Sequence, residues 1–357
     1  MRDIWKDVVE WDASARPFAL ARVVETWGSS PRGVGSAMIV DAAMKVAGSV
    51  SGGCIEGAVI EEAGQVLATG APKKLTYGVD DETAWSVGLS CGGEVSVLVE
   101  RHLPQAGGDG SAEVWKQLRE RVEGNRPAVL LTRLGPGEAS PHLLVTPEGE
   151  AAGSWGAVTE AAAAAGLEAY AGRESGVVEV AGEAVFAQVF PRRDQLLVIG
   201  AGHITLPLVQ YAALVDFETV VIDPREVFAT PERFPVQPAQ LLAKWPGDLL
   251  DGWDLNEDCY CAVLTHDPKI DDEALHRFLE APVAYIGALG GRKSQEKRRA
   301  RLQEAGFAAD EIDRIKGPIG LDIGAETPAE IALSILAEIV AVKRSRTARR
   351  QAAGPGR

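Results

Sequence analysis

Hydrophobic and polar positions are ordered most clearly in the second half of the chain, where short apolar runs alternate with helical patterns. The segment 195–225, QLLVIGAGHITLPLVQYAALVDFETVVIDPR, starts with an apolar run ending at Gly200, takes helical spacing from His203 and closes with a second apolar run. This order predicts a strand, a turn, a helix and a strand. Two further apolar runs, 259–264 and 282–287, are separated by another helical stretch. Strands that alternate with helices predict a doubly wound parallel sheet.

The turn after the first of these strands carries two spaced glycines. Gly200-Ala-Gly202-His203 matches the start of the dinucleotide pattern G-x-G-x-x-G, with Thr205 at the third glycine position. Asp223 lies twenty-one residues after Gly202, where a dinucleotide fold places the carboxylate that contacts a ribose. The alternative is a fold of this kind that has no ligand. We expect a dinucleotide-like ligand, held by Gly200, Gly202, His203, Asp223 and Arg225.

The C-terminal helix is predicted from its first turn. Thr327-Pro-Ala-Glu330 forms a capping box with proline at the first helical position. Helical spacing of apolar residues then follows at Ile331, Ile335, Leu336, Ile339 and Val340. From 343 to 357 the chain has six basic residues, no acids and no apolar periodicity, which predicts a disordered basic tail.

The first half of the chain differs in kind. Runs with β character, such as 19–25 and 95–100, are separated by glycine-rich turns, and helical patterns are fewer. We therefore expect an α/β protein with an N-terminal β-rich α+β domain over 1–190. A C-terminal, doubly wound, Rossmann-like parallel sheet would occupy 191–342, because PRRDQ at Pro191 precedes its first strand.

Composition narrows the class of protein. With 46% hydrophobic and 24% charged residues the chain is typical of a globular fold and not of a disordered or collagen-like one. The formal net charge of −15 argues against a nucleic-acid partner. No apolar run is long enough to span a membrane, and the first residues lack the apolar core of a signal peptide. We expect a cytoplasmic protein with no membrane partner, and a homodimer.

Thr265, His266 and Asp267 follow the strand 259–264 and are expected at the carboxyl edge of the sheet, where such folds bind ligands. We assign all three to the same ligand. In the alternative interpretation, Asp267 or Asp271 is the cap of the next helix.

Two more glycine-rich turns precede helices. The segment 287–292, GALGGR, opens a helix that also carries Lys297, Arg298, Arg299 and Arg301. Positive side chains and free N–H groups together make an anion site, so we expect Gly287, Gly290 and Arg292 to contact the ligand. A solvated basic face is the alternative for the later arginines. A third glycine-rich turn lies at 317–324. Because one ordinary dinucleotide does not need three such turns, they favour a larger and more highly charged ligand, or a lid made from these loops.

Two cysteines of the first half each stand beside paired glycines. The segments are Ser51-Gly-Gly-Cys54-Ile-Glu56 and Ser90-Cys91-Gly-Gly-Glu94. In such turns backbone N–H groups can point at the sulfur or at a bound anion, which favours thiolate. Structural zinc and inert buried thiols are the alternatives. We favour a ligand- or sulfur-handling site with Cys54, Cys91 and Glu56 as reactive residues, whereas Cys259 and Cys261 should be core residues of a central strand.

Taken together, these motifs resemble the xanthine dehydrogenase accessory protein family, of the XdhC/CoxI type. The segments that carry the resemblance are Gly28-Ser-Ser-Pro-Arg32, Gly48-Ser-Val-Ser-Gly-Gly-Cys-Ile-Glu56, Gly88-Leu-Ser-Cys-Gly-Gly93, Gly200-Ala-Gly-His203, Thr265-His-Asp267, Tyr285-Ile-Gly-Ala-Leu-Gly290 and PIGLDIGAETPAEI over 318–331. They keep the family's order over most of the chain. The sequence departs from the family pattern at Thr205, where a small residue is common, and at Gly291, where serine is frequent.

The resemblance implies a chaperone for the molybdenum cofactor, in its molybdopterin or cytosine dinucleotide form. Such a protein supports sulfuration of the cofactor with a cysteine desulfurase and delivers it to a molybdenum hydroxylase apoenzyme. By the same resemblance, Cys54 and Cys91 become candidate ligands of the molybdenum or its dithiolene, and the turns at Gly200 and Gly287 contact the pyrophosphate or nucleotide.

Two other functions fit the same residues. The first is an NAD(P)-dependent oxidoreductase that binds a nicotinamide or other nucleotide, in which Asp223 favours NAD and His203 or His266 is the acid–base group. The second is a scaffold that joins the desulfurase to the target enzyme.

Overall fold

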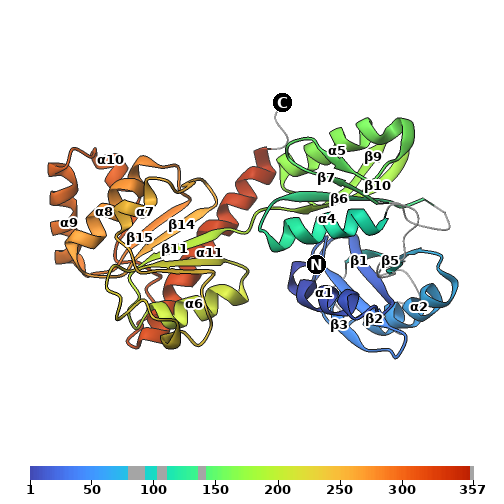
Figure 1. The fold of residues 1–357 in the computed structure, drawn as a ribbon, viewed down its shortest axis with the longest axis horizontal. Helices are drawn as coiled ribbons and strands as arrows, with labels where there is room; N and C mark the ends of the chain where they lie inside the picture. Colours follow the sequence, from blue (N-terminus) through green and yellow to red (C-terminus); the bar gives the residue numbers. More distant parts are fainter. Residues whose placement is uncertain (79–92, 103–110, 136–141, 354–357) are drawn as a thin grey trace. The chain divides into compact units, whose positions relative to one another are not determined.

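The computed structural model describes residues 1–78, 93–102, 111–135 and 142–353 (Figure 1). The chain divides into two compact units, Met1–Arg192 and a second unit that begins at Arg193. The boundary expected from the sequence lay after residue 190. Each unit has its own apolar core, and the two are described separately.

The first unit contains two five-stranded antiparallel sheets. The first sheet has the order β3-β2-β1-β5-β4 and the second β8-β7-β6-β10-β9. The elements of the first half are η1 (Arg2–Ile4), α1 (Trp5–Ala13), β1 (Phe18–Trp27), β2 (Ala37–Asp41), β3 (Val46–Gly48), α2 (Glu56–Thr69), β4 (Lys73–Tyr77) and β5 (Glu94–His102). Those of the second are α4 (Ser111–Glu123), β6 (Ala128–Arg133), β7 (His142–Val145), β8 (Ala151–Ala152), η2 (Gly156–Val158), α5 (Thr159–Gly172), β9 (Gly176–Val180) and β10 (Glu183–Phe190). The expected β-rich α+β domain is confirmed.

The two halves of this unit repeat one fold. Over the described residues each runs helix, three strands, helix, two strands, and each sheet places its strands in the same spatial order. Details repeat as well: the turn after β2 is closed by Asp41 N–H donating to the Lys45 carbonyl, and the turn after β7 by Thr146 N–H donating to the Glu150 carbonyl. The unit is therefore an internal duplication, which the sequence did not reveal.

A buried polar cluster joins the two sheets at equivalent positions of the repeat. The Arg22 guanidinium of β1 is fully buried and donates to Glu100 of β5 at 2.6 Å, to Thr132 of β6 at 2.9 Å and to Gln188 of β10 at 3.1 Å. Strand pairing makes Arg22 the counterpart of Thr132, and Glu100 the counterpart of Gln188. Burial lowers the pKa of Arg22, and the Glu100 carboxylate opposes that shift.

The second unit is a doubly wound α/β domain, as expected. Its parallel sheet has the order β13-β12-β11-β14-β15-β16, which reverses direction between β11 and β14. Its elements are β11 (Gln195–Ile199), α6 (Thr205–Leu214), β12 (Glu218–Ile222), η3 (Pro231–Arg233), β13 (Gln240–Leu242), α7 (Pro246–Leu250), β14 (Cys259–Val263), α8 (Pro268–Glu280), β15 (Tyr285–Ala288), α9 (Arg292–Glu304), α10 (Ala309–Ile312), β16 (Ile315–Lys316) and α11 (Pro328–Ala353). Folds of this topology bind ligands at the carboxyl ends of the strands, where the order reverses.

Helices cover both faces of the parallel sheet (Figure 1). Apolar residues of α6 and α11 pack on one face, and those of α8 and α9 pack on the other. Cys259 and Cys261 of β14 are buried in the second of these cores, which confirms them as core residues. Among the described residues, no helix has the length and apolar character needed to cross a membrane.

The predicted capping box begins α11, since the Glu330 carboxylate accepts from the Thr327 N–H at 2.9 Å. The disordered tail predicted from residue 343 was wrong as far as residue 353, because α11 continues to Ala353. Basic residues of this extension find acidic partners in their own unit: Lys343 lies 2.7 Å from Asp194, and Arg346 lies 3.0 Å from Glu257. Residues 354–357 lie outside the described part of the chain.

We predict that Glu100→Ala lowers the free energy of unfolding by about 3–5 kcal/mol, because it leaves the Arg22 charge buried without its counterion. Urea unfolding of the full chain measures this. The control is Glu123→Ala, which removes an exposed ion pair with Arg119 and should cost less than about 1 kcal/mol. Equal losses in the two variants would contradict the role given to the buried cluster.

Candidate functional site

The glycine turn after β11 lies at the carboxyl edge of the parallel sheet. Gly200 has φ +104°, and a Cβ there would lie 2.7 Å from the Thr265 side chain, so only glycine fits. A Cβ at Gly202 would meet no atom within 4 Å, and His203 is exposed. The turn therefore presents Gly202 to an open space that a ligand can approach.

Thr205 replaces the third glycine of the dinucleotide pattern without disturbing the turn. Its side chain is fully buried, and its hydroxyl donates to the Gly200 carbonyl at 2.6 Å. Because α6 begins at Thr205, this bond ties the start of the helix to the start of the turn.

The Asp223 carboxylate is fully buried and fully engaged. One oxygen accepts from the Arg225 N–H at 3.0 Å and from Arg225 Nε at 2.8 Å. The other accepts from the Ala201 N–H at 2.8 Å and from Arg225 Nη2 at 2.7 Å. Burial by itself would raise the pKa of Asp223, but these bonds to Arg225 and Ala201 lower it. Four donors fill the roughly four acceptor positions of a carboxylate, so Asp223 holds Arg225 and the glycine turn, and not a ribose hydroxyl as the sequence suggested.

The segment after β12 is tied back to the same turn. Arg233 donates to the Ala201 and Phe228 carbonyls, both at 2.7 Å. The guanidinium carbons of Arg225 and Arg233 lie 4.5 Å and 5.1 Å from the centroid of the Phe228 ring. Two cations and one aromatic ring are therefore held beside the glycine turn.

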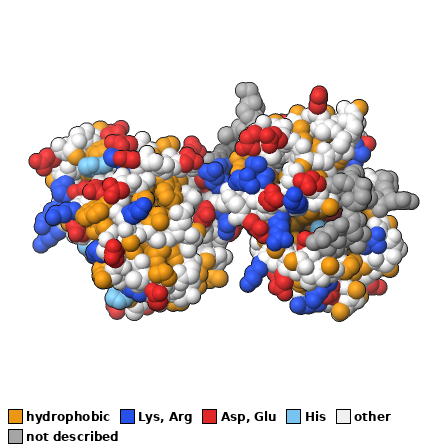
Figure 2. Space-filling view, viewed as in Figure 1, with side chains coloured by type: hydrophobic (Ala, Val, Ile, Leu, Met, Phe, Trp, Pro, Cys, Tyr) orange, Lys and Arg blue, Asp and Glu red, His pale blue; other side chains and the backbone are white. Residues whose placement is uncertain are grey.

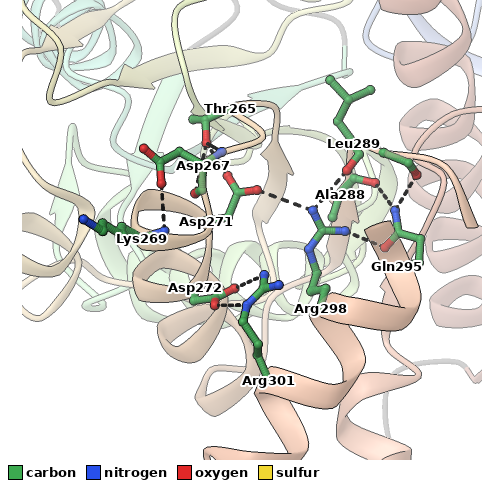
Figure 3. A network of polar contacts seen from close by, with 11 residues as sticks. Thr265, Asp267, Lys269, Asp271, Asp272, Ala288, Leu289, Gln295, Arg298 and Arg301 are labelled. Atoms are coloured by element: carbon green, nitrogen blue, oxygen red, sulfur yellow. Dashed lines mark hydrogen bonds and ion pairs between the residues drawn. The ribbon is translucent and has the colours of Figure 1, made fainter. Parts of the chain in front are cut away.

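The loop after β14 is built mainly by capping bonds (Figure 3). Asp267 caps α8 by accepting from the Lys269 N–H at 3.0 Å, which supports the capping alternative for this residue. Thr265 accepts from the Asp267 N–H and donates to Asp271. His266 is exposed and has φ +70°, uncommon for a residue with a side chain.

A buried network connects this loop with the loop after β15 (Figure 3). Arg298 of α9, only 5% exposed, donates to the Leu289 carbonyl at 3.0 Å and to Asp271 at 3.4 Å. Gln295 donates to the Ala288 and Gly290 carbonyls. Burial raises the pKa of Asp271, and its bonds to Thr265 and Arg298 oppose that rise. Arg298, for which the sequence left an anion site and a solvated basic face open, is instead a buried structural residue. It lies four positions before buried Leu302, and this helical spacing is the sequence signal for its burial.

The three residues expected at the second glycine turn have different surroundings. A Cβ at Gly287 would lie 2.5 Å from both Ile319 and the Tyr285 hydroxyl, so this glycine permits close packing inside the domain. Gly290 serves the turn, against the Ser294 side chain. Arg292 is exposed at the first residue of α9, and Figure 2 shows Lys and Arg side chains gathered over that helix.

In the first unit, two of the glycine-rich segments meet the segment 28–32 at one end of the first sheet. A Cβ at Gly93 would overlap the Ser29 carbonyl oxygen, and one at Gly52 would lie 3.5 Å from Pro31. The structure therefore brings the neighbours of Cys54 and the residue that precedes β5 to the same segment. Cys91 lies outside the described residues.

Glu56, the first residue of α2, holds the conformation of the loop that contains Cys54 through hydrogen bonds. Its carboxylate accepts from the Ser49 hydroxyl at 2.6 Å, from the Ser51 hydroxyl, and from four backbone N–H groups. The backbone donors are those of Val50, Ser51, Gly52 and Gly53, at 3.2, 2.9, 3.1 and 2.8 Å. Burial would raise the pKa of Glu56, but the bonds from Ser49, Ser51 and the backbone outweigh it and lower the pKa to about 2.

This arrangement changes the interpretation of the Cys54 loop. The N–H groups of Cys54 and Ile55 donate to the Ser51 hydroxyl, both at 3.0 Å, so every N–H from residue 50 to residue 55 has an internal acceptor. The expectation that these groups point at the sulfur or at a bound anion is therefore wrong: Glu56 is the anion they hold. Cys54 itself is half-buried with a free thiol. No cluster of three or more metal-ligating side chains occurs among the described residues.

The internal duplication supplies a built-in comparison for this loop. Gly48 and Gly153 are counterparts, since a Cβ at either would press on a backbone carbonyl, that of Ala37 or of His142, at the start of the paired strand. Ile55, the N-cap of α2, lies seven positions after Gly48, whereas Val158, the N-cap of α5, lies only five positions after Gly153. The second copy has neither a cysteine nor the glycine pair here, so the Cys54 loop is an elaboration of the first copy alone.

The chain is similar to known proteins over most of its length. The family model for the XdhC Rossmann domain matches residues 196–339, and that for the XdhC and CoxI family matches residues 11–78. A protein of Bacillus subtilis, described as a probable subunit of xanthine dehydrogenase, is 25% identical, over 91% of this chain and 93% of its own length. The molybdenum cofactor insertion chaperone PaoD of Escherichia coli is 24% identical, over 96% and 88%.

The uncharacterized protein YqeB of Escherichia coli is 27% identical over 96% of this chain, which spans only 46% of YqeB. A crystal structure of a xanthine dehydrogenase from Bacillus halodurans has a TM-score of 0.78 and 26% identity, and covers 97% of each chain.

We predict that Glu56→Gln lowers the free energy of unfolding by about 1–3 kcal/mol near neutral pH, because an amide cannot accept all six donors. The pKa of Glu56 is depressed in the folded chain, so its stabilisation is complete above the ordinary glutamate pKa of 4.5 and is lost as the pH falls toward about 2. The difference between wild type and variant should therefore shrink over that range.

Urea unfolding at a series of pH values measures this difference. Glu61→Gln, an exposed glutamate of the same helix, is the control and should change stability little. A wild-type advantage that stays constant as the pH falls would contradict the role assigned to the Glu56 carboxylate.

Proposed function

Because the chain belongs to the XdhC and CoxI family, we propose that it is an accessory protein that binds the molybdenum cofactor and inserts it into a molybdenum hydroxylase of the xanthine dehydrogenase type. The observation that carries this proposal is the match to the insertion chaperone PaoD over nearly the whole of this chain. The match to a probable xanthine dehydrogenase component over nearly its whole length supports the class of client enzyme.

Both units contain groups whose chemistry suits such a ligand. Molybdenum with its dithiolene is a soft, thiophilic centre, for which a cysteine thiol is a fitting ligand. Cys54 is free and half-buried in a loop held rigid by Glu56. The cofactor's phosphate end fits the glycine turn, where Gly202 leaves open space at the beginning of α6.

The finer parts of the proposal concern the route of the cofactor. We assign Cys54 and Cys91 to contacts with the metal end, and Gly200 and Gly202 to the phosphate end, of molybdopterin or its cytosine dinucleotide form. Glu56 positions the Cys54 loop. A cysteine desulfurase would supply the sulfur that the cofactor receives before insertion, and two chains would act together as a homodimer.

An NAD-dependent oxidoreductase is less well supported. Its dinucleotide needs an acceptor for the ribose hydroxyls, and the carboxylate at the expected position is saturated by Arg225 and Ala201. His203 and His266 are exposed at the sheet edge, with no polar partner that would orient either ring as an acid–base group among the residues described.

We predict that Cys54→Ala lowers the molybdenum bound per chain while leaving the fold intact, because a ligand is lost and the thiol is only partly buried at the edge of an apolar cluster. Cys261→Ala is the matched control: this thiol is buried in the core, so its loss should cost about 1 kcal/mol of stability and leave cofactor retention unchanged. Metal content and circular dichroism measure the two effects. Equal molybdenum retention in both variants would remove Cys54 from the site.

We also predict stoichiometric activation of the client. The loaded protein, supplied with a desulfurase and cysteine and mixed with an apo-hydroxylase, should raise hydroxylase activity in proportion to the amount added. The metal-free protein should not turn over NADH or NADPH with small carbonyl substrates. Multiple turnover that depends on His203 or His266 and not on Cys54 would replace the chaperone assignment by the oxidoreductase one.

A further inference from the structure

The crevice beside the glycine turn of the second unit lacks the ribose-binding group that its topology leads one to expect. In this fold a carboxylate at the end of the second strand accepts hydrogen bonds from ribose hydroxyls. Here that carboxylate, Asp223, is completely buried, and its acceptor positions are filled by the Ala201 N–H and three donors of Arg225. A ribose diol at this position would find no acceptor on Asp223 without breaking a buried ion pair.

Arg225 occupies the corresponding place at the crevice. Its Nε and Nη2 donate to the two Asp223 oxygens, a forked geometry that fixes the plane of the guanidinium. The side chain is 37% exposed, and among the described residues its Nη1 has no hydrogen-bond acceptor. The bond to Asp223 raises the pKa of Arg225, so the group stays a cation. One edge of a rigid, charged donor is therefore left for a ligand.

The position of this cation relative to the glycine turn is also fixed. A single oxygen of Asp223 joins the Ala201 N–H and Arg225 Nη2, so two hydrogen bonds of 2.8 and 2.7 Å separate the turn from the guanidinium. Arg233 ties the intervening segment to the same turn by donating to the Ala201 and Phe228 carbonyls. Arg225 and the turn thus form one preorganised surface.

Other charges near Arg225 are compensated locally. Asp267 and Asp271 face it closely enough to raise its pKa. Asp267 is engaged as the cap of α8, however, and Asp271 is bonded to Thr265 and Arg298 (Figure 3). Neither carboxylate takes the Nη1 edge, so these acids leave it open to an incoming anion.

We propose that Arg225 makes this crevice selective for a ligand that presents a phosphate, and not a ribose diol, at the end of β12. The ligand class is a phosphomonoester held by Arg225 beside the Ala201–Gly202 turn. The inference rests on the proposed function only in placing a phosphorylated ligand in this crevice, and it reverses the expectation that Asp223 selects NAD. Its test requires neither molybdenum nor a client enzyme, so either idea can fail without the other.

Two probes that differ by one phosphate test the proposal: adenosine 2′,5′-bisphosphate and adenosine 5′-monophosphate. Isothermal titration of the full chain at low salt should show that the bisphosphate binds about 10-fold more tightly or better, corresponding to one added charge-assisted contact. Arg225→Gln should abolish this preference. The charge-matched control is Arg277→Gln, which alters an exposed arginine paired with Asp251 on α8 and should keep the preference.

Arg225→Lys is the second variant, because removal of the whole cation from a buried carboxylate can unfold the domain. Lysine keeps the positive charge but cannot make the two parallel hydrogen bonds to Asp223, so the preference for the bisphosphate should fall below that of the wild type. The proposal is overturned if the two probes bind the wild type equally, if neither binds, or if the preference persists undiminished in a folded Arg225 variant.

Discussion

A carboxylate withdrawn wholly or partly from water is stabilised by donors that fill its acceptor positions, and each candidate site contains one: Asp223 is fully buried and Glu56 is half-buried. In the first unit Glu56 takes two hydroxyls and four backbone N–H groups, and so defines the loop that carries Cys54. In the second unit Asp223 takes Ala201 and Arg225, and so joins the glycine turn to the segment after β12. Each carboxylate fixes the backbone around a candidate site, and its negative charge is stabilised by donors of the protein itself.

The internal duplication explains how such a loop arises on a stable frame. Both copies keep the same strand order and the same close approach of a glycine to the neighbouring strand. They share a polar centre in which Arg22 and Glu100 of one copy meet Thr132 and Gln188 of the other. The two extra residues before α2 lengthen one loop of one copy, and Val50 and Ile55 of that loop pack into the apolar core of the copy.

The two units also differ in how their sites are built. The crevice of the second unit is a consequence of topology, since any sheet whose strand order reverses between β11 and β14 leaves space at that point. The Cys54 loop owes nothing to topology, because the second copy has the same topology without it. The chaperone function proposed above requires a cargo to be held and also released; the Cys54 loop and the glycine turn are each preformed by hydrogen bonds within their own unit.

The sequence alone determined the architecture of the second unit and the start of its last helix. Strands that are buried on both faces have continuous apolar runs in the sequence, and a capping box is contained within four residues. Both signals are therefore local. The duplication escaped prediction because it is kept in strand order and not in residue identity. The sequence shows which hydrogen-bond donors and acceptors are present near each turn, but not which of them are hydrogen-bonded to other groups of the folded protein. That Asp223 accepts from the Ala201 N–H, that Ile319 fills the space above Gly287 and that Arg298 is buried against Asp271 was decided only by tertiary structure, because these partners come from segments that meet only when the chain is folded.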